Sequence, residues 1–117
     1  MNINIDYGKR VPIYEQIVRE IEKLITLGVL APNTQIPSVR ALAYDLGINP
    51  NTVKKAYDIL EENGLIISKS TKGTFISDNI DKAKDLKIEE LIERIDNLVS
   101  ELKTYGLTKE EIIKRMK

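Results

Sequence analysis

The chain has 117 residues, and its 18 Lys and Arg are balanced by 18 Asp and Glu, so the formal net charge at pH 7 is zero. That balance argues against a strongly basic protein that coats nucleic acid by charge alone. The chain contains no Cys and no His, which removes disulfides, thiolate nucleophiles, His-based catalytic triads and nearly all zinc or haem sites. The composition therefore predicts no enzyme, no metal and no cofactor.

The N-terminus and the apolar content point to a soluble protein. The first residues lack the basic and long apolar parts of a signal peptide, and no apolar run approaches the ~20 residues of a membrane span. With 42% apolar and 31% charged residues, the composition is that of a globular protein. We therefore expect a cytoplasmic protein without a membrane partner.

The first predicted element is a helix that begins at Pro12 and ends at Gly28. Its apolar residues recur along one face, which is typical of an amphipathic helix. They are Ile13, Ile17, Ile21, Leu24 and Ile25. Pro32 then disfavours helical backbone in the residue before it, so residues 30–33 are expected to form a turn.

Two short helices are predicted next. Ser38 precedes a periodic segment that stops at Gly47, and Asn49-Pro50 opens another that stops at Gly64. Ser and Asn are preferred N-caps, Pro fits the first helical position, and Gly fits the position after a helix. Two helices joined by only three residues form a helix-turn-helix pattern.

A β-hairpin with a positive tip is expected after the third helix. The β-prone runs 65–68 and 74–77 flank Lys69-Ser70-Thr71-Lys72-Gly73, a basic stretch that favours a turn. A hairpin in this position makes residues 1–77 a winged helix-turn-helix domain.

Residues 78–117 are expected to form a C-terminal region of two helices. The first is long and carries an apolar stripe at Ile88, Leu91, Ile92, Ile95, Leu98, Val99 and Leu102. Tyr105-Gly106 ends it, and Thr108-Lys109-Glu110-Glu111 is a capping box for the last helix. A symmetric dimer is the common way to bury such a stripe, and an antiparallel hairpin against the first helix is the alternative. The predicted fold is mainly α with a small β-hairpin: a winged domain followed by a helical dimerisation arm.

The third helix carries the side chains that could meet DNA. A recognition helix enters the major groove by its N-terminal end. On a helical wheel, Asn51 and Lys55 point outward, with Thr52 and Lys54 on the flanks. The Asn51 amide can pair with a base edge, and the other three can reach phosphates or guanine. A capped helix with a solvated charged face is the plainer interpretation of the same residues, but the order of the elements favours DNA.

Arg40 is the candidate contact from the second helix. A cation in the first turn opposes the helix dipole, at a cost of ~0.3–1 kcal/mol. Either a nearby carboxylate, such as Asp6 or Glu15, or an anionic partner such as a phosphate would offset that cost.

These motifs, in this order, resemble the N-terminal domain of GntR-family bacterial transcription regulators over roughly residues 10–77. The resemblance is carried by Pro12-Ile13-Tyr14-Glu15-Gln16-Ile17, Gly28-Val29-Leu30, Ile36-Pro37-Ser38-Val39-Arg40, Leu42-Ala43, Asn49-Pro50-Asn51-Thr52-Val53, Ala56-Tyr57, Leu60 and Lys72-Gly73-Thr74-Phe75-Ile76. The Asn-Pro-Asn-Thr-Val run and the short helical tail resemble the YtrA subfamily.

The resemblance implies a homodimeric winged-helix repressor that binds a palindromic operator in double-stranded DNA, often upstream of its own operon with genes for an ABC transporter. It assigns DNA contacts to Arg40, to the start of the recognition helix and to the wing tip. With the residues argued above, the candidate DNA-binding set is Ser38, Arg40, Asn49, Asn51, Thr52, Lys54, Lys55, Lys69, Thr71, Lys72 and Gly73.

Three positions depart from the family pattern. Pro50 stands where many members have an arginine, so Asn51 or Lys54 must take over base contact. Thr71 replaces the first glycine of the wing. Asn33 replaces a glycine after the proline, which Asn tolerates if the backbone there is left-handed.

The alternative function is a winged-helix protein-interaction module without specific DNA binding. Such an interface would favour aromatic or apolar residues where Asn51, Lys54 and Lys55 stand. No residue points to a small-molecule effector.

Overall fold

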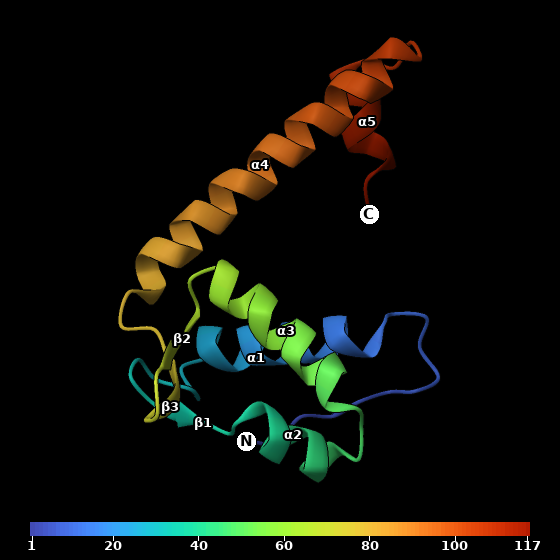
Figure 1. Ribbon diagram of the computed structural model, residues 1–117. Helices are drawn as coiled ribbons and strands as arrows, with labels where there is room; N and C mark the ends of the chain where they lie inside the picture. The colour runs from blue at the N-terminus through green and yellow to red at the C-terminus, as the bar shows by residue number, and fades with distance from the viewer. The chain divides into compact units, whose positions relative to one another are not determined.

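A computed structural model describes all residues from Met1 to Lys117, and the chain divides into two units, Met1–Ala83 and Lys84–Lys117. Five helices and three strands follow one another along the chain (Figure 1). They are α1 (Ile13–Thr26), β1 (Gln35–Ile36), α2 (Val39–Leu46), α3 (Pro50–Glu62), β2 (Ile66–Lys69), β3 (Gly73–Ile76), α4 (Ile80–Thr104) and α5 (Lys109–Arg115). The predicted winged-helix fold, mainly helical with a small antiparallel sheet, is confirmed.

The core of the first unit lies where α3 packs between α1 and α2 (Figure 1). The centres of the apolar faces of these helices are buried, because each helix turns its periodic apolar stripe toward the others. The stripe residues Ile13 and Leu24 of α1 are half-buried. The largest side chains without solvent exposure are Ile17, Ile21, Leu42, Val53, Leu60 and Ile76. Helix α1 begins one residue later than predicted, since the extended ψ of 147° places Pro12 at the N-cap.

The predicted capping of the helix-turn-helix is confirmed. The Ser38 hydroxyl accepts a hydrogen bond from the Ala41 N–H at 3.1 Å, and the Asn49 side chain accepts one from the Asn51 N–H at 2.8 Å. Gly47 ends α2 in a left-handed conformation with φ 67°. These local signals fix the ends of α2 and the start of α3, and so fix the turn between them.

The sheet has a third strand that the sequence did not predict. The strand order is β1-β3-β2, with β1 antiparallel to β3 (Gln35 opposite Phe75) and β2 antiparallel to β3. The prediction of a two-stranded hairpin was therefore incomplete, because β1 has only two residues and lies between a turn and Pro37. The hairpin strands also begin and end one residue away from the predicted limits. Asn33 has φ 65°, which confirms the left-handed backbone at that position.

The N-terminal segment is attached to α1 by Gln16. The Gln16 side chain accepts from the Asp6 N–H at 2.8 Å and donates to the carbonyls of Asp6 and Val11 at 3.0 and 2.9 Å. Its polar atoms are thus satisfied although the residue is buried. The segment places Ile3 in the core of the first unit.

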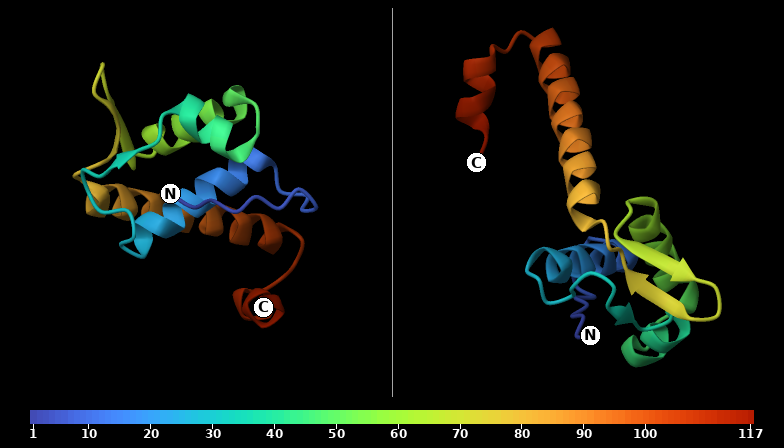
Figure 2. Two further views of the ribbon diagram at one scale, coloured as in Figure 1. Left: turned by 90° about the horizontal axis from the view of Figure 1, so that it is seen from below. Right: turned by 90° about the vertical axis from the view of Figure 1, so that its left-hand side faces the viewer.

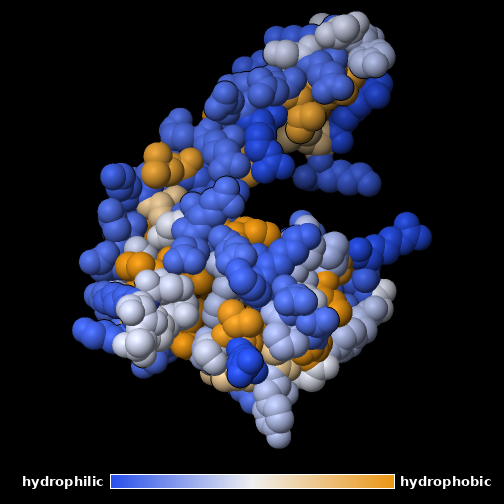
Figure 3. All heavy atoms as spheres, viewed as in Figure 1, coloured by the Kyte–Doolittle hydropathy of each residue, from blue (hydrophilic) through white to orange (hydrophobic).

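The second unit contains most of α4 and all of α5. The predicted stripe residues on α4 are 40–60% exposed, apart from the half-buried Val99. Hydrophobic side chains are seen among charged ones along this part of the chain (Figure 3). The predicted capping box of α5 is confirmed, with both hydrogen bonds between Thr108 and Glu111 present. No helix combines the length and the apolar character that a bilayer span requires.

Candidate nucleic-acid interface

The start of α3 presents polar side chains to solvent. Asn51, Lys54 and Lys55 are exposed, and Thr52 is half-buried. The Asn49 oxygen caps the helix, which leaves the NH2 group of that side chain as its donor for an outside partner. The predicted outward face of α3 is confirmed, while the contacts of these residues with DNA stay a prediction.

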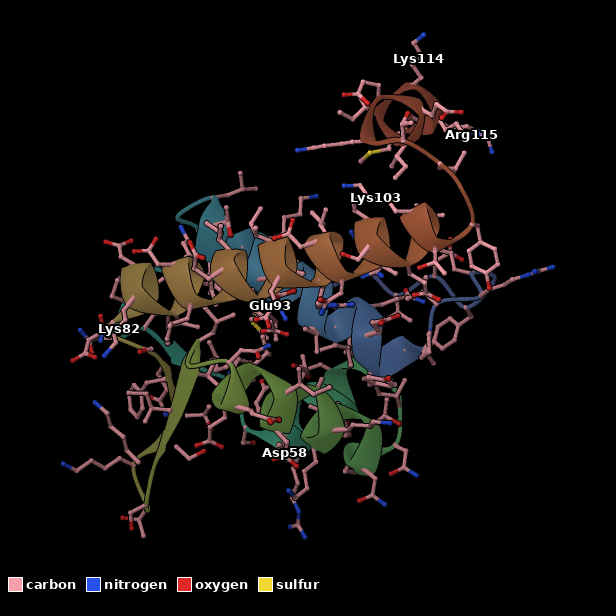
Figure 4. The ribbon with its side chains drawn as sticks, turned by 90° about the horizontal axis from the view of Figure 1, so that it is seen from above. Asp58, Lys82, Glu93, Lys103, Lys114 and Arg115 are labelled. Atoms are coloured by element: carbon pink, nitrogen blue, oxygen red, sulfur yellow. The ribbon has the colours of Figure 1, made fainter.

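Lys54 forms an ion pair within its own helix. Its ammonium lies 2.9 and 3.2 Å from the two carboxylate oxygens of Asp58, one turn later. Asp58 lies on the side of α3 that faces away from α1 (Figure 4). Both side chains are largely exposed, at 64% and 59%, so the pair contributes little to stability. A phosphate or a base edge can therefore compete with Asp58 for Lys54.

Lys55 is held against α1. Its ammonium lies 4.0 Å from the centre of the Tyr14 ring, which is a cation–π contact. This contact restrains the Lys55 side chain on the side of α3 nearer to α1. The helical wheel places Lys55 outward and Lys54 on a flank, and the structure adds the neighbour of each: Tyr14 for Lys55 and Asp58 for Lys54.

Arg40 carries an exposed guanidinium in the first turn of α2. The ion pairs of the structure join Arg19 to Glu15, Lys54 to Asp58 and Lys87 to Glu90, so none involves Arg40. The proposed carboxylate partners Asp6 and Glu15 do not pair with it. Its charge is therefore free to bind an anion beside the Ser38 cap.

The wing presents two cations on a tight turn. The Lys72 N–H donates to the Lys69 carbonyl at 2.8 Å, and the left-handed residue of the turn is Ser70 with φ 42°. Thr71 and Lys72 are exposed at the tip, which projects from the domain (Figure 2). Lys69 lies 4.9 Å from the Phe75 ring centre. No acidic residue stands between Gly64 and Ser77, so the tip has a locally positive charge.

Two contacts of residues 35–37, which precede α2, were not predicted from the sequence. The Tyr57 hydroxyl donates to the Pro37 carbonyl at 2.7 Å, and the Gln35 amide donates to the Lys72 carbonyl at 3.2 Å. Burial raises the pKa of Tyr57, which keeps the phenol protonated as a donor. The sequence carried only a weak signal for these contacts, because each joins segments about 20 or more residues apart.

Apart from the carboxylate of Asp58, the exposed groups at the start of α3, in the first turn of α2 and at the wing tip are cations, amides and hydroxyls. Such groups bind phosphates and base edges by charge and hydrogen bonds. No cluster of three or more His, Cys, Asp or Glu side chains is close enough together to hold a metal ion. A capped helix-turn-helix followed by a basic wing defines the protein as a winged helix-turn-helix protein of the DNA-binding class.

Comparison with known proteins identifies the family. The family model described as "Bacterial regulatory proteins, gntR family" matches residues 13–76, more than half of the chain. The chain therefore belongs to the GntR family. It is 46% identical over 77 residues to the HTH-type transcriptional repressor YtrA of Bacillus subtilis, an alignment that covers 66% of this chain and 59% of that repressor.

Solved structures agree with this assignment. A Listeria monocytogenes EGD-e protein described as a transcriptional antiterminator has a TM-score of 0.74 at 38% identity, over 97% of this chain and 86% of the other. YtrA from Sulfolobus acidocaldarius has a TM-score of 0.66 at 33% identity, over 96% and 90%. The DNA-binding domain of AraR in complex with operator ORR3 has a TM-score of 0.55 at 28% identity, over 66% and 93%.

Proposed function

We propose that this protein is a transcriptional repressor that binds a palindromic operator as a homodimer. The observation that carries the proposal is the set of exposed cations on three successive elements: Arg40 on α2, Lys54 on α3 and Lys72 on the wing. Arg40 and Lys72 have no ion-pair partner within the chain, whereas Lys54 pairs with Asp58. Structural likeness to a GntR-type domain described as bound to operator DNA supports the proposal.

The winged domain would contact DNA with three elements at once. The N-terminal turns of α3 would enter the major groove, with Asn51 at a base edge and Thr52 and Lys54 at phosphate or guanine. Ser38, Arg40 and Asn49 would contact the backbone beside them, and Lys69, Thr71, Lys72 and Gly73 would meet the neighbouring groove. Because the chain has no net charge, non-specific binding would be weak and binding would depend on a matched site.

A salt titration and one variant test the DNA contact. A duplex is first selected by the wild-type chain from a random pool, and its affinity is then measured as salt rises. Arg40→Ala is expected to weaken binding about tenfold or more, because a hydrogen-bonded charge is lost, at an unchanged melting temperature. Lys23→Ala, an exposed cation at the end of α1, is the matched control and should bind like the wild type.

The same salt titration distinguishes specific DNA binding from the alternative function, a protein-interaction module. A protein-interaction module would bind random and selected duplexes equally poorly, and its affinity would not fall steeply with salt. That result, or wild-type affinity in Arg40→Ala, would contradict the proposed interface.

The homodimer would be formed by the exposed stripe on α4. Burying an apolar side chain of this size contributes ~1.5–3 kcal/mol, so seven such positions per chain favour association strongly. Two recognition helices related by a two-fold axis would contact half-sites about 34 Å apart.

The Ile95→Asp substitution tests the dimer, because it places a charge on the stripe. It should yield monomers in sedimentation at micromolar concentration. Lys103→Glu, which leaves the stripe intact, should remain dimeric, and a monomeric wild type would exclude the dimer.

The regulated genes are proposed to include those of the protein's own operon, one of which would encode an ABC transporter. The resemblance to the YtrA subfamily and the match to a protein named a repressor support this proposal. The protein would then act in the cytoplasm. A reporter fused to the promoter of its own gene should be more active when the gene is deleted, and reduced reporter activity would indicate activation instead.

A further inference from the structure

At the wing tip, the backbone of β1 supplies no hydrogen-bond donor to the edge of strand β3 that continues beyond β1. Strand β1 ends at Ile36, opposite Thr74. The next residue, Pro37, has no N–H group, and the Ser38 N–H makes no backbone hydrogen bond to the wing. The Lys72 carbonyl lies just beyond the end of β1, so the ladder between β1 and β3 stops one step short of the tip.

The Gln35 side chain fills this gap. Its Nε2 donates to the Lys72 carbonyl at 3.2 Å. Gly73 provides the space for it: a Cβ atom at Gly73 would stand 2.5 Å from Gln35 Nε2 and 3.5 Å from its Cδ. Gly73 also has φ 122°, a conformation that favours glycine. The hydrogen bond and the close contact both indicate that Gln35 and Gly73 fit as a pair.

The residues that follow Gln35 connect this pair to the other two DNA-contacting elements. Pro37 accepts a hydrogen bond from Tyr57 on α3 at 2.7 Å. Ser38 caps α2 and leads directly into the turn that presents Arg40. Residues 35–38 therefore touch the wing, the recognition helix and the start of α2 within four positions. We call residues 35–38 the connector.

We infer that Gln35 is a positioning residue of the DNA interface: it fixes the wing tip to the connector and thereby sets where Lys72 meets DNA. This inference rests on the proposed function. Gln35 acts on DNA through Lys72, whose backbone carbonyl it holds while the Lys72 ammonium stays free at the tip. Its loss should therefore matter only while the Lys72 side chain is present.

A double-mutant cycle on the full chain tests this dependence. Gln35→Met keeps the approximate size of the side chain and removes the donor, and Lys72→Ala removes the charge. With a duplex selected by the wild type, Gln35→Met is expected to weaken binding about three- to tenfold, the range of one lost hydrogen bond. In the Lys72→Ala background the same substitution should change affinity less than about twofold, because coupled residues are not additive.

A control variant and a second measurement separate positioning from a general loss of structure. Ser68→Ala lies on the exposed part of β2 and should bind like the wild type. In the free protein, NMR relaxation of the Lys72 and Gly73 amides should show greater motion in Gln35→Met, at an unchanged melting temperature. A purely structural defect would lower affinity equally in both backgrounds and lower the melting temperature.

The outcomes distinguish the inference from the function on which it rests. Wild-type affinity in Gln35→Met, or effects of Gln35→Met and Lys72→Ala that simply add, would overturn the positioning role alone. A wild-type chain that binds no duplex in a salt-dependent manner would overturn the proposed function, and the positioning role with it.

Discussion

The two units of the chain use the same apolar residue types in opposite ways. In Met1–Ala83, most isoleucine and leucine side chains at helical spacing are buried or half-buried, and Ile17 and Leu60 have no exposed surface. In Lys84–Lys117 the same spacing leaves Leu98 60% exposed. The periodicity of apolar residues therefore identifies the face of a helix that can be buried. It does not say whether the surface that buries this face lies in the same chain. The helices of the winged domain bury their apolar faces against one another, whereas the apolar stripe on α4 stays exposed and can pack against another chain.

The largest expected effect compares two leucines. Leu60→Ala removes a fully buried side chain and should lower the free energy of unfolding by about 2–5 kcal/mol, which includes the cost of the cavity. Leu98→Ala should leave the unfolding of the winged domain unchanged and weaken self-association instead. Urea denaturation at two protein concentrations measures both effects. An equal, concentration-independent loss in the two variants would remove the distinction between the units.

The second prediction contrasts cations of the two units. Lys54→Ala should weaken binding to the selected duplex and reduce the salt dependence by about one ion, whereas Lys114→Ala on α5 should do neither. Asp58→Asn should raise the affinity for random duplex, because it frees Lys54 from its ion pair. Fluorescence anisotropy across a salt series measures all three variants. If Lys114→Ala lost as much affinity as Lys54→Ala, the proposed position of the DNA interface on the winged domain would be contradicted.

The third prediction concerns helix capping. Ser38→Ala and Asn49→Ala should each destabilise the winged domain by about 1 kcal/mol, since each removes the acceptor for an orphan N–H at a helix start. Thr108→Ala removes the corresponding cap of α5 and should not shift the unfolding of the winged domain. Thermal denaturation followed by the signals of each unit distinguishes these results. A shift of the winged domain in Thr108→Ala would show that the units unfold together.

The smallest expected effect is a pH dependence confined to α5. The hydrogen bond from the Thr108 backbone, followed by that from its side chain, holds the pKa of Glu111 below its ordinary value. The stabilisation is therefore complete above the pKa that Glu111 has in the unfolded chain, and it is lost as the pH falls through the lowered folded value. NMR signals of α5 between pH 7 and 3 should show fraying at the acid end. Glu111→Gln keeps a capping box and should abolish the pH dependence.

Local signals in the sequence predicted most of the winged domain. Ser38, Gly47 and Asn49 set helix ends through atoms within a few residues, so their roles follow from the sequence alone. Strand β1 did not follow, because two residues carry no periodicity and its pairing with β3 is decided some 40 residues away. The neighbours of the predicted cations also depend on tertiary structure. Lys55 contacts the ring of Tyr14 on α1, and a helical wheel of α3 contains no residue of another helix.

The residues that form the core of the winged domain extend beyond both ends of the segment that matches the family model. The family match runs over residues 13–76, yet Ile3 before it and Ile80 and Ala83 after it belong to the same buried cluster. A fragment trimmed to the limits of the match would expose that cluster to water at both ends. A winged domain that is to be transferred to another regulator should therefore extend from Ile3 to Ala83. It then includes the N-terminal segment that Gln16 holds against α1.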